Sequence, residues 1–149
     1  MRFFLVAVLI AVMDQITKWL IILNFSLGER LTVFQPWLHF TYVTNTGAAF
    51  GIFPGRAWFF VAFSFIIIAG IVFYNCFYRP ALNMRITTAL ITGGAAGNLI
   101  DRLFRSEVVD FIDLGWWPVF NVADSAIFCG AAGLLFFTFI KNKNEAAHE

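Results

Sequence analysis

The sequence has few charged residues, and those it has nearly cancel. Only 13% of its 149 residues are Asp, Glu, Lys or Arg, whereas a soluble domain carries roughly 25%. Ten basic residues stand against nine acidic ones, which gives a formal net charge of +1. There is no basic tract of the kind that attracts nucleic acid. The composition therefore excludes an ordinary soluble domain and argues against nucleic acid as a partner.

Cysteine and histidine are also scarce. The two cysteines, Cys76 and Cys129, lie far apart in apolar runs, and we expect both to be inert, buried thiols. The two histidines, His39 and His148, are too widely separated for a zinc-binding HExxH motif. We therefore expect neither a metal site nor a cofactor.

Apolar residues are abundant: 60% of the chain is hydrophobic, twenty residues are Phe, and the mean hydropathy is +0.80. The chain is thus expected to be an integral membrane protein. The long apolar runs cover residues 3–23, 57–74, 82–100 and 119–140. Each is close to the roughly 20 residues that cross a bilayer. We predict four transmembrane helices in one domain, 1–149. The third is the weakest, because Arg85 falls in its first turn and it contains Gly93, Gly94 and Gly97, and a buried loop is its alternative.

An even number of crossings places both termini on one side of the membrane. Five Lys and Arg residues lie on that side and four on the other, so the positive-inside rule places the termini in the cytoplasm. The opposite side holds residues 24–56 and 101–118. Within them, Leu31–Val33 and Phe40–Thr44 alternate apolar residues with threonine. This pattern predicts a small β-sheet that lies on the bilayer surface.

Two ionisable residues interrupt the first apolar run. Asp14 and Lys18 are spaced i, i+4, so they lie on one face of a helix and can form an ion pair. They also argue against a cleaved signal peptide. Charged groups in a membrane segment often mark function, although a structural ion pair is the alternative. Lys18 lies nearer the interface, and its ammonium group could reach out to it.

Polar residues also gather where the third run leaves the membrane. Asn98, Asp101 and Arg102 lie on one side of that helix, and we interpret Asp101 as a structural residue with Arg102 as its partner. Gly93 and Gly97 form a GxxxG pattern, which is typical of close helix packing. The small, polar segment around Asn45 and Gly47 lies ahead of the second run and is a weaker signal.

Two further acids have a more specific interpretation. Asp110 lies in an apolar, strand-like stretch, and Asp124 falls in the first turn of the fourth helix, behind a predicted N-cap at Asn121. Two carboxylates in one site do not both ionise easily, so the pair holds one proton at neutral pH. Such a pair can activate water and protonate a leaving amine, which is the chemistry of an aspartyl peptidase.

Five motifs occur in order along the chain: Asp14 with Lys18; Asn45-Thr46-Gly47-Ala48-Ala49-Phe50; Gly97-Asn98 with Asp101-Arg102; Val108-Val109-Asp110-Phe111; and Phe120-Asn121 with Ala123-Asp124-Ser125. Together they resemble the bacterial lipoprotein signal peptidases, signal peptidase II. The resemblance implies four transmembrane helices with a periplasmic β-cradle in the bacterial inner membrane. It also implies cleavage of prolipoproteins just before their diacylglyceryl-modified cysteine. The expected partners are these substrates and membrane lipids, with the chain acting as a monomer.

The resemblance also implies which residues form the site, at the periplasmic face. The catalytic pair falls on Asp110 and Asp124, in a peptidase that needs no metal. Residues expected to shape the pocket or bind substrate are Asp14, Lys18, Asn45, Gly47, Asn98, Asp101, Arg102, Asn121 and Ala123. Thirteen residues separate the two aspartates, fewer than in many members, and this short connection is expected to alter how the site is covered.

Two other functions fit parts of the pattern. Ser125 with Lys18 could form a Ser/Lys peptidase, although Ser125 is also explained as a capping or packing residue. Asp14, Lys18, Asp101 and Asp124 could instead line an ion or proton path in a small transporter. Such a path should run through the depth of the membrane, whereas most of these acids gather at one face.

Overall fold

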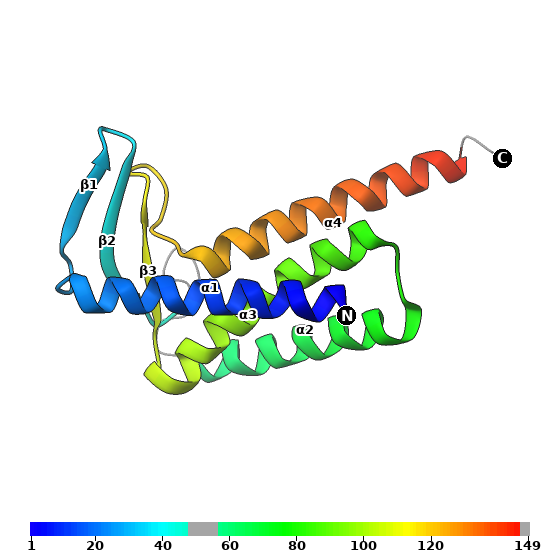
Figure 1. Cartoon of the computed structure of the whole chain (residues 1–149), viewed down its shortest axis with the longest axis horizontal. Helices are drawn as coiled ribbons and strands as arrows, with labels where there is room; N and C mark the ends of the chain where they lie inside the picture. Colours follow the sequence, from blue (N-terminus) through cyan, green and yellow to red (C-terminus); the bar gives the residue numbers. More distant parts are fainter. Residues whose placement is uncertain (48–56, 147–149) are drawn as a thin grey trace.

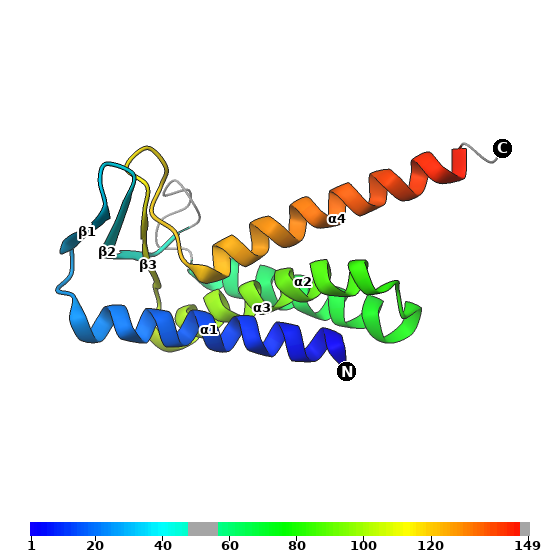
Figure 2. The same ribbon diagram turned by 45° about the horizontal axis from the view of Figure 1, so that its top comes forward.

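Four long helices and a small sheet make up the computed structural model, which describes residues 1–47 and 57–146. The elements in chain order are α1 (Arg2–Asn24), β1 (Arg30–Phe34), β2 (Leu38–Asn45), α2 (Ala57–Tyr78), α3 (Leu82–Arg105), β3 (Val108–Asp113) and α4 (Val122–Ala146). The helices run alongside one another, and the strands gather at the end where α1 and α3 finish and α4 begins (Figure 1). The first residues of α1 lie at the opposite end (Figures 1 and 2).

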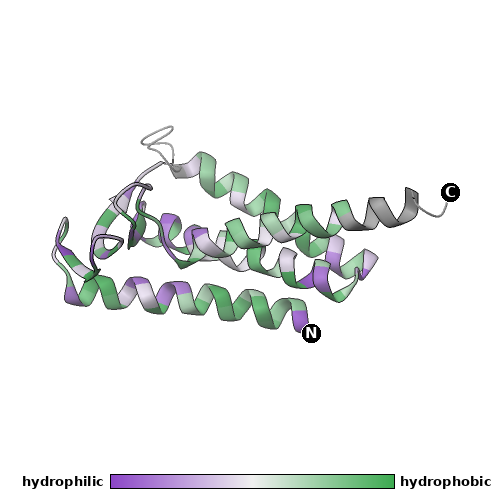
Figure 3. Cartoon of the chain, turned by 90° about the horizontal axis from the view of Figure 1, so that it is seen from above, coloured by the Kyte–Doolittle hydropathy of each residue, from purple (hydrophilic) through white to green (hydrophobic). Residues whose placement is uncertain are grey.

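Among the described residues, three helices are long and apolar enough to cross a membrane: Arg2–Asn24, Trp58–Tyr78 and Val122–Phe139. Their outer surfaces are rich in exposed Phe, Leu, Ile and Trp, and in Figure 3 the ribbon of these helices is coloured as hydrophobic over much of its described length. A chain that leaves this much apolar surface uncovered requires lipid around it. The expected membrane protein is therefore confirmed.

The helix α3 is as long as the other three but less apolar, and it packs against each of them. Small residues allow this close packing. A Cβ atom added at Gly93 would lie 2.5 Å from the backbone oxygen of Ala7 in α1. One added at Gly130 in α4 would lie 2.6 Å from the backbone oxygen of Thr87 in α3. The predicted packing role of the GxxxG pattern is confirmed, because the backbones of α1 and α3 meet at Gly93.

The three strands form an antiparallel sheet in the order β1-β2-β3. Phe40 of β2 pairs with Ile112 of β3, and Asn45 pairs with Val108. One face of the sheet packs on the end of α1, where Ile21 and Phe111 share a small apolar core. The strands predicted from the apolar and threonine alternation are thus confirmed, and the last residues of β2 are placed beside β3.

The prediction that both cysteines are buried is wrong. Cys76 on α2 and Cys129 on α4 are exposed. In a soluble protein an apolar run turns toward the core, whereas these helices present much of their apolar surface outward. An apolar neighbourhood in the sequence therefore does not predict burial of a thiol in this chain.

Candidate active site

A cavity of about 760 Å³ opens where the sheet meets the helices. Its polar lining includes Asn45 from β2, Asn98 and Arg102 from α3, Asp110 from β3 and Asp124 from α4. Its remaining walls are largely apolar and come from the segment 114–120 and from the side of α4 that includes Ile127, Phe128 and Ala131. The cavity therefore joins a small group of carboxyl and amide groups to an apolar channel.

Asp110 is held on the central part of β3 and is 3% exposed. Its Oδ1 accepts a hydrogen bond from Nδ2 of Asn121 at 2.6 Å, and its Oδ2 accepts one from Nδ2 of Asn45 at 3.2 Å. Burial, reinforced by the negative charge of Asp124, raises the pKa of Asp110 to about 7. The carboxyl can therefore hold a proton at neutral pH.

Asp124 lies in the first turn of α4. Its backbone N–H donates to Oδ1 of Asn121 at 2.9 Å, which confirms Asn121 as the N-cap. One carboxylate oxygen, Oδ1, accepts a hydrogen bond from Nδ2 of Asn98 at 2.7 Å. Asn121 contacts both aspartates, because its Nδ2 also donates to Asp110. Both acids line one cavity and are joined through one asparagine.

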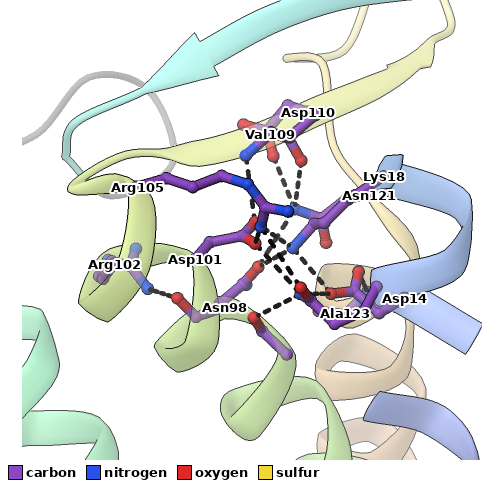
Figure 4. A network of polar contacts seen from close by, with 12 residues as sticks. Asp14, Lys18, Asn98, Asp101, Arg102, Arg105, Val109, Asp110, Asn121 and Ala123 are labelled. Carbon is purple, nitrogen blue, oxygen red and sulfur yellow. Dashed lines mark hydrogen bonds and ion pairs between the residues drawn. The ribbon is translucent and has the colours of Figure 1, made fainter. Parts of the chain in front are cut away.

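Behind the cavity lies an ionic cluster centred on Lys18 (Figure 4). The ammonium Nζ lies 2.8 Å from Asp14, 2.8 Å from Asp101 and 2.9 Å from Oδ1 of Asn98. The ion pair predicted between Asp14 and Lys18 is confirmed. The idea that Lys18 reaches the interface is wrong, since its side chain is 0% exposed. The two carboxylates offset part of the cost of burying this ammonium group.

The arginine that pairs with Asp101 is not the predicted one, Arg102. It pairs with Arg105, and its Oδ2 also accepts the backbone N–H of Val109 at 3.3 Å. Arg102 instead donates to the backbone oxygen of Gly47 at 3.2 Å and lies 5.1 Å from the ring centre of Phe60. Consecutive helical residues point about 100° apart, whereas residues four apart share a face. The predicted pairing of Asp101 with Arg102 is therefore wrong.

Asp14 ties α1 to the start of α4. Its Oδ1 accepts the backbone N–H of Ala123 at 2.9 Å, so the first turn of α4 has one cap from Asn121 and another from α1. Gly97 makes room for this carboxylate, because an added Cβ there would lie 2.5 Å from Asp14 Oδ2. Ala123, which is 0% exposed, enters the site through its backbone.

The predicted site residues thus divide into two layers. Those that line the cavity are Asn45, Gly47, Asn98, Arg102, Asp110 and Asp124. Behind them, Lys18 and Asn121 contact Asn98 of this layer. Asp14 and Asp101 pair with Lys18, and Ala123 donates its N–H to Asp14. Residues 48–50 of the second motif lie outside the described residues.

Two residues of the cluster, Gln15 and Arg105, were not predicted. Gln15 donates to Oδ1 of Asp101 at 3.1 Å and accepts a hydrogen bond from Arg105 at 3.3 Å. The i, i+4 spacing of Asp101 and Arg105 was the available signal for the arginine. Gln15 carries no such signal, because its role depends on how α1 packs against α3.

The Ser/Lys alternative is not supported by the geometry. The Oγ of Ser125 donates to the backbone oxygen of Asn121 at 2.9 Å, while the ammonium group of Lys18 is occupied by Asp14, Asp101 and Asn98. A catalytic lysine must instead be free to accept a proton from the serine. Within the described part of the chain, no group of three His, Cys, Asp or Glu side chains could hold a metal ion.

Apolar helices, a sheet at their end and a cavity with carboxyl groups between them define an integral-membrane protein with a candidate active site. Two solved structures of bacterial membrane enzymes, determined by the in meso method, share this fold. One, at 2.3 Å resolution, matches with a TM-score of 0.92 and 33% identity, over 96% of this chain and 90% of the other. The second, at 1.9 Å, has a TM-score of 0.85 and 34% identity, over 92% of each chain.

The sequence comparisons identify the family. The family model described as "Signal peptidase (SPase) II" matches residues 6–140. A lipoprotein signal peptidase of Syntrophomonas wolfei is 44% identical over 145 residues, 97% of each chain. One of Shouchella clausii is 43% identical over 145 residues, 95% of each chain. The chain belongs to the signal peptidase II family.

Proposed function

We propose that the protein is an aspartic endopeptidase that removes signal peptides from prolipoproteins, with Asp110 and Asp124 as its catalytic pair. It cuts just before the diacylglyceryl-modified cysteine and needs no metal. Membership of the signal peptidase II family supports the assignment of this reaction. The observation that supports the catalytic pair is that both carboxyls line one cavity. The transporter alternative has no support among these relatives.

In the proposed reaction, water lies between the two carboxyl groups. The ionised aspartate takes a proton from water, while its protonated partner polarises the scissile carbonyl. The water oxygen attacks the carbonyl carbon to form a tetrahedral intermediate. This collapses with cleavage of the C–N bond, as the aspartate that took the proton from water gives it to the cysteine nitrogen. The pKa of about 7 for Asp110 supports a pair that shares one proton at neutral pH.

The apolar channel has a role in admitting a lipid-anchored substrate. Ile127, Phe128 and Ala131 of α4 line this cavity, as do Trp116 and Trp117 of the segment before it. In our proposal the substrate enters sideways from the bilayer, with its acyl chains in hydrocarbon and its scissile bond at the interface. The depth of the aspartates then selects the bond that is cut.

The same proposal includes an orientation in the bacterial cytoplasmic membrane. The helices α1, α2, α3 and α4 all cross, which puts the sheet and the cavity on the periplasmic face and both termini in the cytoplasm. The helix axes are roughly aligned, and the strands gather at one end of the helices; both features support this topology (Figures 1 and 2). We take the working unit to be a monomer.

The test uses purified full-length protein with a prolipoprotein in its diacylglyceryl-modified and unmodified forms. We expect cleavage of the modified form only. Asp110→Asn and Asp124→Asn should each reduce turnover by about 10³-fold or more, because either removes one member of a cooperating pair. Ser125→Ala is the matched control, and it should keep near-normal turnover. Normal turnover in either aspartate variant, or a dead serine variant, would refute the catalytic assignment.

A further inference from the structure

The aspartates of the cavity are surrounded by three asparagines that share one arrangement. Each points its amide nitrogen at a carboxylate: Asn45 and Asn121 at Asp110, and Asn98 at Asp124. An asparagine side chain has an acceptor oxygen on its other branch. A half-turn of the amide would therefore present oxygen to the carboxylate and remove the hydrogen bond. Something must hold each amide in the useful orientation.

Two of the three amides are held by backbone groups. The oxygen of Asn45 accepts the N–H of Gly47 at 2.9 Å, and that of Asn121 accepts the N–H of Asp124 at 2.9 Å. A backbone N–H can only donate. The atom it faces must therefore be the oxygen, which leaves the nitrogen for Asp110 in both cases.

The third amide is held by a side chain from α1. The ammonium group of Lys18 lies 2.9 Å from Oδ1 of Asn98. An ammonium group has three donors and no acceptor, so it identifies the atom it touches as oxygen and directs Nδ2 toward Asp124. The same oxygen also accepts Nδ2 of Asn121 at 3.2 Å, which links Lys18 to the asparagine that serves Asp110.

We propose that Lys18 is a positioning residue for catalysis, which fixes the Asn98 amide so that an N–H group faces Asp124. This role rests on the proposed function of the aspartate pair. The ion pairs to Asp14 and Asp101 hold the ammonium group in place, and its third donor reaches Asn98. Lys18 is fully buried and is not among the cavity-lining residues, so it acts through Asn98 and not on substrate.

The test must separate this role from the contribution of Lys18 to charge balance and folding. Asp14→Asn/Lys18→Met removes one acid and one base together, so the net charge of the cluster is unchanged. The oxygen of an Asn at position 14 can still accept the N–H of Ala123, and Asp101 keeps Arg105 and Gln15. Arg105→Met is the matched control, because it removes a cation from Asp101 and has no contact with Asn98.

We expect the double variant to unfold near the wild-type temperature in detergent, while kcat falls by about 10- to 100-fold, the effect of losing a hydrogen bond to a charged group. KM should change little. The pH above which activity is lost should move upward, because fewer N–H donors face the ionised pair. The charged groups around this pair are Lys18 of α1 and Arg102 of α3, with Asp14, Asp101 and Arg105 behind them.

Arg105→Met should keep kcat within about threefold of wild type and should leave the pH profile in place. A folded double variant with wild-type kcat and an unchanged pH profile would overturn the positioning role. An equal kcat loss in Arg105→Met would also overturn it, because the effect would then be that of any disturbed ion pair. Activity in Asp110→Asn or Asp124→Asn would instead count against the catalytic pair itself.

Discussion

Asp110 is the residue whose environment most directly predicts a pH dependence. Burial and the charge of Asp124 raise its pKa to about 7. Above this pH both carboxyls are ionised, and neither can polarise the substrate carbonyl. We therefore expect kcat/KM to fall about tenfold per unit as the pH rises beyond this pKa. A pH–rate profile between pH 5 and 9 measures this, and a flat profile across neutral pH would contradict the shared proton.

Asn45 gives a second prediction at this scale. Its hydrogen bond stabilises the ionised form of Asp110 and so lowers the pKa of that group. In Asn45→Ala the pKa of Asp110 should rise, and the alkaline loss of activity should move to higher pH. Turnover at pH 7 should fall about tenfold because an amide donor is lost. A shift toward lower pH would show that Asn45 does not stabilise the carboxylate.

How well single residues could be predicted depended on local chemistry. An acid among apolar neighbours, Asp110, and an acid behind an N-cap, Asp124, are both recognisable from sequence, because their environment is set by adjacent residues. The partner of Asp101 was missed because adjacency in sequence was taken for adjacency in space. The depth of Lys18 was missed because it depends on Asp101, which lies more than eighty residues away in α3.

At the scale of the elements, the packing of α3 against α1 depends on a glycine, Gly93. At Gly93 an added methyl group would lie 2.5 Å from the backbone oxygen of Ala7, and backbone cannot move aside without shifting a helix. Gly93→Ala should therefore destabilise the protein by about 1–3 kcal/mol. Thermal unfolding in detergent measures this.

Gly70 in α2 is the matched control, since no described atom lies within 4 Å of a Cβ added there. Gly70→Ala should be neutral or stabilising by up to about 1 kcal/mol, the difference in helix propensity. An equal loss in Gly70→Ala would mean that the contact with Ala7 does not explain the effect of Gly93→Ala.

Most elements could be predicted, and their ends could not. The strands appear in the sequence because alternation at the period of two is a local pattern. The helices α2 and α3 run to Tyr78 and Arg105, beyond the predicted ends at 74 and 100. Hydropathy reports how far a helix lies in lipid, whereas hydrogen bonding allows the helix to continue into polar surroundings.

The proposed topology gives a prediction for the whole molecule. Leu31→Cys and Glu107→Cys lie at the sheet end, while Ala81→Cys lies at the start of α3, away from the sheet. In a protein without its own cysteines, an impermeant thiol reagent added outside the cell should label the first two positions and not the third. Labelling of positions 31 and 107 from opposite sides would exclude four crossings, because the two halves of the cavity would then be separated by the bilayer.

The modest hydropathy of α3, the helix in contact with all three others, has a consequence for biogenesis. On its own it would partition poorly from the translocon into lipid, because Thr92, Asn98 and Asp101 would face hydrocarbon. In the four-crossing topology it is expected to enter as a hairpin with α2 and to be retained once α1 and α4 shield it. Correct insertion of this helix would then depend on the same partners that complete the enzyme.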